Sequence, residues 1–459
     1  LLVQSRSRHT RSHRQNDVSK IISFYEMEKG QVFTCPFFLF RIMKYCSLVL
    51  LLFLCLSCES ARPYFSINNE SYSDRDVFKY IDQESFATLE ASEKETQLRS
   101  LAGDLLLLKE GKKLGIDTLE SIQFRIQEKI HNRLLDSLLR QKVVRPMFSD
   151  SSLMNAYIQL QKTVGLNHLI INHRFSKGKA VNRTKIKAKQ LAEKVRMLIK
   201  SDSISFERAV YRYCDDPLLK DEKGRLGYIH YGRMIPQIIE VAWDPDSPRF
   251  PPVIESDFGF HIIEILGSKQ IPQDPFEKVK HEIHKMISLK KLPEADFSFS
   301  RMENLLTEKY HFRLLNDALD TLYKLVKPGK VSPTMGLVTQ AKFPEPIAMI
   351  GDEEVTVSWL RGRVMANTSL RETVCYMSYT LIKSIRDVIF RELGSRHARQ
   401  LGLIPDGELE RFERRVELAT IQDGLLSQLL KEDKGLTNEI LRNRLVFKND
   451  IKINQEILI

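Results

Sequence analysis

Five short signals between Leu166 and Leu266 constrain this chain more than any other feature, because they follow one another in a single stretch. A strand-like apolar segment comes first, an acidic turn and two glycine turns follow, and a Phe-Gly turn before another apolar segment closes the set. The signals are Leu166-Asn167-His168-Leu169-Ile170-Ile171, Tyr213-Cys214-Asp215-Asp216-Pro217, Gly224-Arg225-Leu226-Gly227-Tyr228, Gly232-Arg233-Met234 and Phe258-Gly259-Phe260-His261-Ile262-Ile263. Apolar runs bounded by Gly, Asp and Pro turns predict one complete small domain of mixed α and β structure.

This ordered set resembles the parvulin-type peptidyl-prolyl isomerases. The resemblance covers residues 163–268 and implies an α+β fold there, with a small antiparallel sheet and surrounding helices. The implied activity is rotation about X-Pro peptide bonds, against a barrier of about 18–20 kcal/mol. Such a rotation needs an apolar floor for the proline ring, polar groups beside the moving carbonyl and a rigid frame. It needs no covalent step and no cofactor.

The resemblance also implies which residues form the site. His168 and His261 match two histidines that lie side by side on central strands, and Asp216 would lie beside the rotating carbonyl. We expect these three as the catalytic residues. The expected substrate-binding residues form an apolar pocket for the proline ring, and they are Leu226, Met234, Ile238 and Phe258.

Other interpretations of these residues stay open. Ile238 stands where the family usually has Phe, so the pocket stays apolar but loses a flat ring. The Pro-rich segment 243–252 replaces a turn that is usually short. The two histidines could orient the site without transferring a proton, and Asp216 could be only a turn former before Pro217.

The start of the chain has the pattern of a targeting segment. Residues 1–42 mix Ser, Arg and His without a sustained period and do not begin with Met. Met43-Lys44, an apolar run over 46–56 and Ser57-Cys58 follow, which is the order of a signal peptide. The end of this run resembles a bacterial lipoprotein box, so we expect Cys58 to be lipidated and to anchor the protein in the cell envelope. An ordinary secretory signal cut nearby is the alternative.

Charge and cysteine usage exclude several classes of protein. Residues 1–57 hold eight Lys/Arg and three Asp/Glu; without them, 62 basic residues stand against 56 acidic ones, a net charge of +6. That mild excess forms no basic stripe, so we expect no nucleic-acid partner. Beyond Cys58 only Cys214 and Cys375 remain, which predicts no disulfide framework. The histidines lack the neighbouring ligands of a zinc site, so no metal is expected.

Helical patterns flank the central domain on both sides. Before it, residues 65–73 predict a strand, a turn and a strand, and helices are expected near 92–114, 118–142 and 150–162. After it, residues 274–326 predict a helical connector that is interrupted near Pro293.

The strand-turn-strand pattern recurs at residues 348–356, followed again by helical segments. This recurrence predicts a weak internal repeat, the alternative being that strand-turn-helix starts are common in unrelated segments. Each copy resembles the N-terminal chaperone module of SurA-like proteins. The expected divisions are an upstream extension that is not native and is disordered at 1–42, a lipoprotein signal peptide at 43–57, a helical chaperone module at 58–162, the isomerase domain at 163–268, a connector at 269–340 and a second helical module at 341–459.

Three hypotheses about function follow. The first is a lipid-anchored prolyl isomerase that also holds unfolded or proline-containing clients of the periplasm or outer membrane. The second is a holdase chaperone whose isomerase domain does not turn over substrate. The third is an accessory subunit of an envelope assembly or secretion complex.

Overall fold

The computed structural model describes residues 63–177, 181–326, 332–431 and 433–458 of the 459-residue chain. It separates Leu1–Arg62 from one compact unit, Pro63–Ile459. The expected extension, the signal peptide and Cys58 therefore lie outside the described residues. Within the described part, no helix combines the length and the apolar character that crossing a membrane requires.

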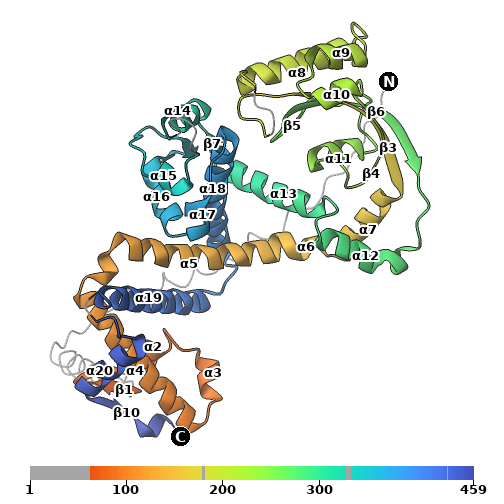
Figure 1. The fold of residues 1–459 in the computed structure, drawn as a ribbon. Helices are drawn as coiled ribbons and strands as arrows, with labels where there is room; N and C mark the ends of the chain where they lie inside the picture. Colours follow the sequence, from red (N-terminus) through yellow and green to blue (C-terminus); the bar gives the residue numbers. More distant parts are fainter. Residues whose placement is uncertain (1–62, 178–180, 327–331, 432, 459) are drawn as a thin grey trace, which may run out of the picture. The chain divides into compact units, whose positions relative to one another are not determined.

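The central domain is built on a four-stranded antiparallel sheet in the order β4-β3-β6-β5. Its elements in chain order are β3 Lys162–Ile171, α8 Lys185–Lys200, α9 Phe206–Tyr213, α10 Pro217–Asp221, β4 Arg225–His230, α11 Pro236–Ala242, β5 Ile254–Ser256 and β6 Gly259–Gln270. Helices α8 and α9 cover one face of the sheet and α11 covers the other (Figure 1). The predicted α+β domain is thus confirmed.

Alternation along the two central strands assigns side chains to these two faces. Leu169 and Ile171 of β3 pack in the core that contains α8 and α9, whereas Leu166 packs in the core that contains α11. On β6, Phe260 and Ile262 belong to the first core. The histidines that lie between these residues in sequence therefore face the α11 side.

Two segments outside the central domain share one order of elements, and we name them the first and the second repeat. The first repeat contains β1 Phe65–Ile67, β2 Glu70–Tyr72, α2 Asp74–Val77, α3 Gln83–Ala87, α4 Ala91–Lys113, η1 Ile116–Thr118 and α5 Glu120–Leu138. The second repeat contains β8 Ala348–Ile350, β9 Glu353–Val355, α16 Val357–Met365, α17 Thr368–Glu372, α18 Ser378–Gln400 and α19 Asp406–Leu429.

The remaining elements connect these parts. After α5 come a π-helical turn η2 Leu139–Val144, α6 Arg145–Met147 and α7 Asp150–Leu160. After the central domain come α12 Phe276–Ser288, α13 Glu294–Lys309, β7 Phe312–Leu314, α14 Asn316–Val326 and α15 Met335–Val338. The chain closes with α20 Asn438–Lys448, β10 Ile451–Ile453 and η3 Gln455–Ile457.

The two repeats agree in backbone detail. Each hairpin turn begins with a residue in the left-handed region, Asn68 at φ 55° and Gly351 at φ 57°. Helices α4 and α18 both have 23 residues, and each is followed after one residue by a left-handed glycine, at Gly115 and Gly402. A left-handed glycine here is the usual way to end a helix, because it satisfies the last carbonyls without steric cost.

A salt bridge occupies the same place in both repeats. Lys109 of α4 pairs with Glu70, the first residue of β2, and Arg396 of α18 pairs with Glu353, the first residue of β9. The two cations occupy the same position when counted from the start of these equally long helices. Each bridge therefore ties the long helix to the second strand of its own hairpin.

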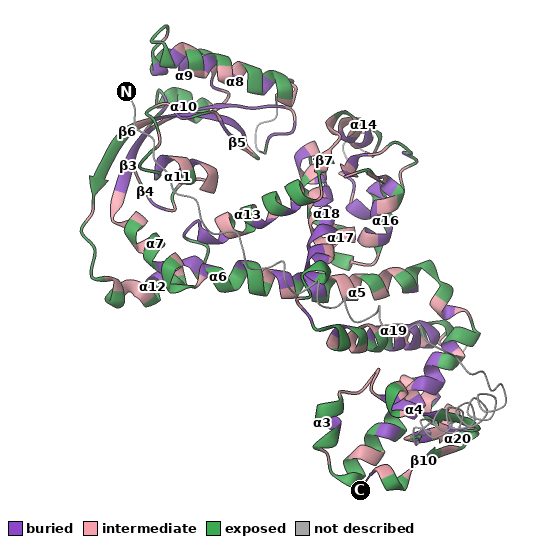
Figure 2. Ribbon diagram, turned by 180° about the vertical axis from the view of Figure 1, so that it is seen from behind, coloured by how far each residue is buried: buried purple, intermediate pink, exposed green. Residues whose placement is uncertain are grey.

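The sheets of the two repeats are completed by strands from elsewhere in the chain. The C-terminal β10 pairs with β1, giving the order β10-β1-β2, while β7 pairs with β8, giving β7-β8-β9. One core therefore joins residues 65–122 to residues 418–458, and another joins residues 134–143 to residues 302–409. Figure 2 shows buried residues along α18 and α19, which contribute to these two cores.

These pairings cross the domain boundaries that we expected. Residues 312–314, expected within a helical connector, form β7 and belong to the sheet of the second repeat. Strands of three residues carry too few positions for alternation to reveal them, and pairing between distant segments leaves no local signal. The boundaries themselves stay predictions.

Candidate functional site

Two histidines form the centre of the candidate site. His168 of β3 pairs in register with Ile263 of β6, and His261 of β6 pairs with Ile170 of β3, so the histidines are diagonal neighbours on one face. His168 Nε2 lies 2.8 Å from His261 Nδ1, and the ring planes differ by 18°. Both side chains are buried, at 7% and 2% exposure. The predicted side-by-side arrangement is present.

Ser256 extends this pair into a chain of hydrogen bonds. Its Oγ lies 2.6 Å from His261 Nε2 and accepts a hydrogen bond from the Phe258 N–H at 3.0 Å. Sequence analysis did not identify Ser256. The available signal was a hydroxyl residue two positions before the Phe-Gly turn and five before His261.

Burial keeps both imidazoles neutral. Desolvation lowers the pKa of His168 to about 4, against the smaller opposing influence of the Asp216 carboxylate. Burial also lowers the pKa of His261 well below its usual value, helped by His168. At neutral pH each ring therefore carries one N–H, and the hydrogen bonds run in one direction along Ser256, His261 and His168. Neutral, mutually bonded imidazoles form a rigid frame and do not act as a charged acid.

Asp216 is presented next to this frame by the start of α10. It is the N-cap of that helix, with Pro217 at the first helical position, and its Oδ1 accepts the Leu218 N–H at 2.9 Å. The residue is half-buried, and its carboxylate is close enough to influence the pKa of His168. Asp216 therefore forms the turn before α10 and also lies next to the histidine pair. Its turn-forming role and its predicted site role do not exclude each other.

Asp215 fixes the segment that carries Asp216. Its Oδ2 accepts the Asn172 N–H at 2.8 Å and a hydrogen bond from Arg183 Nη1 at 2.6 Å. Arg183 Nη1 also donates to the Asn172 carbonyl at 2.8 Å. This network ties the end of β3 to the acidic turn. Arg183 was missed at the sequence level, because nothing near position 183 indicates a contact with residue 215.

The four expected pocket residues pack into two adjoining cores. Leu226, Met234 and Ile238 pack in the α11 core, while Phe258, together with Leu226, packs against the other core. Leu226 and Met234 are half-buried, whereas Ile238 has no exposed surface. Ile238 can therefore contribute to an apolar floor only by packing beneath the side chains that form its surface. Its role in substrate binding, like that of the other three, stays a prediction.

A polar cavity of about 490 Å³ lies beside this region. Ser256 and Asp257 line it, together with Pro236 and Gln237 at the start of α11. None of the four expected pocket residues is among its lining residues. The cavity therefore adjoins the candidate site without being the apolar pocket that we expected.

Two glycines allow the backbone to approach closely around the histidines. Gly224 has φ 79°, and a Cβ there would lie 2.9 Å from the His168 carbonyl oxygen. Gly259, in the Phe-Gly turn, has φ 139°, and a Cβ there would lie 2.6 Å from the Ile171 carbonyl oxygen. Both positions need glycine for conformation and for space.

The Pro-rich segment 243–252 is held firmly against the central domain. Trp243 is buried and donates from Nε1 to the Gln159 carbonyl at 3.3 Å. The Arg249 carbonyl accepts the Ile265 N–H at 2.9 Å, and Arg249 Nε donates to Glu264 at 2.9 Å. The departure from the family pattern is therefore a largely exposed segment that is fixed by Trp243 and by the contacts of Arg249 with β6.

Among the described residues, no group of three or more His, Cys, Asp or Glu side chains is placed to hold a metal ion. The free Cys214 and Cys375 are both buried, and burial raises the pKa of each thiol, that of Cys375 to about 11.

Comparison with known proteins agrees with this geometry. Residues 153–269 match the PPIC-type PPIASE domain. The central domain is therefore a parvulin-type peptidyl-prolyl isomerase domain, as the resemblance implied.

Among curated proteins, the chain is similar to foldases of the PrsA type. It is 33% identical over 93 residues to foldase protein PrsA 1 of Bacillus cereus, covering 20% of this chain and 32% of that protein. It is 20% identical over 202 residues to foldase protein PrsA 3 of Bacillus cereus, covering 44% of this chain and 60% of that protein. The chain thus spans less than two thirds of the length of either relative.

Solved structures with some similarity include PrsA from Bacillus anthracis, with 17% identity, a TM-score of 0.24, and coverage of 38% of this chain and 68% of that one. Another comes from work on two SurA-like chaperones of Campylobacter jejuni, PEB4 and the periplasmic protein Cj1289. It has 18% identity, a TM-score of 0.21, and coverage of 53% of this chain and 96% of that one. These TM-scores are too low to establish a common overall fold.

Proposed function

We propose that this protein is a prolyl isomerase and folding chaperone of the cell envelope. The observation that carries the proposal is the neutral His168–His261 pair, held by Ser256 on the central strands of a parvulin-type domain. The central domain would isomerise X-Pro bonds, and the two repeats would hold unfolded or proline-containing client chains.

The chemistry follows from what a twisting amide needs. As the bond rotates, resonance is lost, the carbonyl carbon becomes more positive and the nitrogen lone pair localises. The carboxylate of Asp216 would favour that state electrostatically from beside the carbonyl. Leu226, Met234 and Phe258 would contact the proline ring, with Ile238 beneath them, and His168 and His261 would keep this surface rigid. No proton transfer is required of the histidines.

Peptide turnover tests this proposal. The chain from Pro63 onward, which is one compact unit, should accelerate cis–trans exchange of a short X-Pro peptide. Asp216→Ala and Met234→Ala should each lower kcat/KM by about tenfold or more, the range expected when one positioned group is lost. Leu218→Ala is a matched control for Asp216→Ala, since Leu218 is 75% exposed on the same turn. Equal turnover by the Asp216 and Met234 variants and the parent would overturn the site assignment.

A non-catalytic holdase is the second candidate, and one observation favours it. Ile238, where the family usually has Phe, has no exposed surface with which to contact proline. A holdase would suppress client aggregation with negligible peptide turnover. Measuring both activities on one preparation separates the two candidates.

Envelope anchoring through Cys58 is a further part of the proposal. It is supported by the charged start, the apolar run and the Ser57-Cys58 ending of segment 43–58. Mass spectrometry of the mature N-terminus tests it. Diacyl or triacyl modification of Cys58, lost in Cys58→Ser, is the expected result, and cleavage elsewhere without lipid would refute anchoring.

A further inference from the structure

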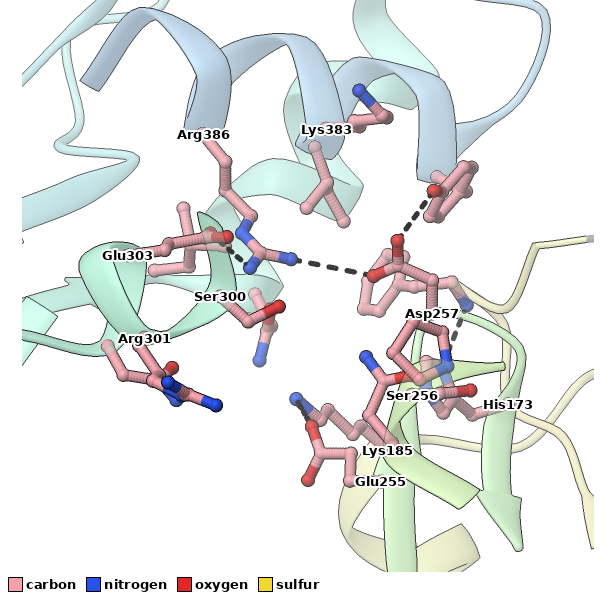
Figure 3. Close-up of a pocket in the computed structure, with 18 of the residues that line it drawn as sticks. His173, Lys185, Glu255, Ser256, Asp257, Ser300, Arg301, Glu303, Lys383 and Arg386 are labelled. Atoms are coloured by element: carbon pink, nitrogen blue, oxygen red, sulfur yellow. Dashed lines mark hydrogen bonds and ion pairs between the residues drawn. The ribbon is translucent and has the colours of Figure 1, made fainter. Parts of the chain in front are cut away.

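The turn between β5 and β6 is contacted from outside its own domain. Ser256 and Phe258 of this turn belong to the candidate site, and Asp257 lies between them. Tyr379 of α18 donates from Oη to Asp257 Oδ2 at 2.8 Å, and Arg386 of the same helix lies 3.6 Å from Asp257 Oδ1. Figure 3 shows Arg386 reaching toward Asp257 from the α18 side of the cavity. The second repeat therefore holds the middle residue of a site-forming turn.

A second contact connects the same two parts of the chain. Ser378, the first residue of α18, donates from Oγ to the Arg174 carbonyl at 3.2 Å. Arg174 also pairs through Nη1 with Asp320 of α14 at 3.2 Å. It belongs to the segment after β3, which reaches the β5–β6 turn through the Lys177 N–H, a donor to the Asp257 carbonyl at 2.7 Å. Both segments next to the histidine pair thus lie against the second repeat.

The groups on α18 are suited to hold a carboxylate. Burial and the neighbouring Asp257 raise the pKa of Tyr379, so its phenol remains a donor at neutral pH. The guanidinium of Arg386 is oriented from its other side by Glu303 of α13, at 2.5 Å. The cavity of about 490 Å³ lies between these groups and the start of α11, so the side chain of Asp257 is held from the α18 side by Tyr379 and Arg386.

We propose that Tyr379 and Arg386 are positioning residues for the prolyl site. Helix α18 holds Asp257, Asp257 sets the turn, and the turn places Ser256 against His261 and Phe258 beside the proline ring. The second repeat is then coupled to the isomerase site, so that a chain binding at α18 and a proline binding at the turn influence each other. For its activity readout this inference rests on the function proposed above.

Two variants break the contact and two serve as controls. Tyr379→Phe removes only the hydroxyl, and Arg386→Gln removes the charge facing Asp257. Arg386→Lys keeps the charge and should partly rescue. Lys383→Gln is the matched control, because Lys383 lines the same cavity on the same helix but pairs with Asp387 of that helix at 3.1 Å.

Hydrogen exchange and turnover, measured on the chain from Pro63 onward, give independent readouts. In Tyr379→Phe and Arg386→Gln, the amides of Lys177 and Phe258 should exchange roughly threefold to tenfold faster, the range that loss of one typical hydrogen bond produces at a half-exposed carboxylate. The kcat/KM for an X-Pro peptide should fall by a similar factor, while Lys383→Gln matches the parent in both readouts.

The outcomes separate the two proposals. A parent protein without turnover refutes the proposed isomerase function, and the exchange rates then decide the positioning claim alone. Unchanged exchange at Lys177 and Phe258 in both variants overturns the positioning claim, whatever the turnover. An equal loss of turnover in Lys383→Gln also overturns it, since the effect would then be one of general charge.

Discussion

The two repeats share their order of elements but differ in how they are completed. The second repeat receives β7 from the preceding segment, with α14 and α15 between β7 and its hairpin, whereas the first receives β10, which lies more than 370 residues beyond its hairpin. The long helices differ as well, because α18 carries a buried charge where α4 carries a buried Leu. The same order of elements is therefore compatible with a third strand from either a nearby or a distant segment. It is also compatible with either an apolar or a charged residue at the buried position of the long helix.

Removal of residues 436–459 should have the largest effect, and it should fall on the first repeat and on the end of α19 that shares its core. It deletes α20 and β10, exposes the backbone edge of β1 and uncovers Phe65 and Leu98, which are buried in the parent. An unpaired strand edge over an opened core is not stable in water. Hydrogen exchange should show loss of protection in β1, β2 and α4.

Protection of β3 and β6 in the same truncated chain is the internal control, because the isomerase sheet has its own core. Retained protection at β1 and β2 would show that distant closure is dispensable.

Glu392→Ala tests the ionic centre of the second repeat. Glu392 is 5% exposed and accepts hydrogen bonds from Arg363 Nε at 2.9 Å and Arg396 Nε at 2.7 Å. Removing it leaves Arg363 without its carboxylate partner and Arg396 with Glu353 alone, so the free energy of unfolding should fall by about 3 kcal/mol, the lower end of the range for breaking a buried pair. Urea unfolding followed by the fluorescence of Trp359, whose ring lies 3.6 Å from the Arg363 guanidinium, measures it.

Leu105→Ala is the matched variant in the first repeat, at the corresponding position of α4. It should cost about 2–5 kcal/mol through lost burial and a cavity, without moving the Trp359 signal. A Glu392→Ala variant as stable as the parent would show that the ionic cluster does not hold α18.

Acid should weaken the isomerase domain before the first repeat. The pKa of His168 is about 4 when folded, below the unfolded value near 6.5, so the unfolded state binds the proton first. The contribution of His168 is fully present above pH 6.5 and is lost as the pH falls toward 4, which costs about 2 kcal/mol at pH 5. Residues 63–118 of the first repeat contain no His, whereas its helix α5 contains His131, whose pKa burial also lowers, so the comparison is with residues 63–118.

Fluorescence of Trp243 in a Trp359→Phe background follows the isomerase domain in urea at pH 7 and pH 5. His168→Gln should reduce the difference in unfolding free energy between the two pH values. An equal difference in parent and variant would contradict the assignment of the acid sensitivity to His168.

Breaking either of the two equivalent salt bridges should change the stability of the fold least, and the difference between the two variants compares the repeats at a single position. Lys109 and Glu70 are 45% and 59% exposed, so Lys109→Gln should cost less than about 1 kcal/mol. Arg396→Gln should cost more, because Arg396 also binds the buried Glu392. Thermal unfolding of both variants measures this, and equal shifts in Tm would argue against a special role for the ionic cluster.

Sequence reasoning reached the isomerase domain because its signals are local. A few neighbouring residues are enough to indicate each of them: the His168 strand, the Asp215-Asp216-Pro217 turn and the Phe258-Gly259 turn. The helix expected at 92–114 was found at Ala91–Lys113, because its leucines recur at helical spacing.

What the sequence did not reveal depends on contacts between distant segments. The pairing of Phe65 with Ile453 joins two strands of three residues from opposite ends of the described chain. The contact of Tyr379 with Asp257 depends on the packing of the second repeat, which no local pattern encodes. The resemblance implied a pocket role for Ile238, which stays a prediction, but its complete burial depends on tertiary packing that the sequence does not show.

The rate of cis–trans exchange in a short X-Pro peptide, measured by NMR exchange spectroscopy, tests the central claim most directly. Uncatalysed exchange takes tens to hundreds of seconds, so catalysis by the chain from Pro63 onward would be seen as exchange cross-peaks within a mixing time of about one second. We predict such cross-peaks with the parent protein and their marked weakening with Asp216→Ala. Exchange no faster than in the free peptide, from a protein shown to be folded, would contradict the account.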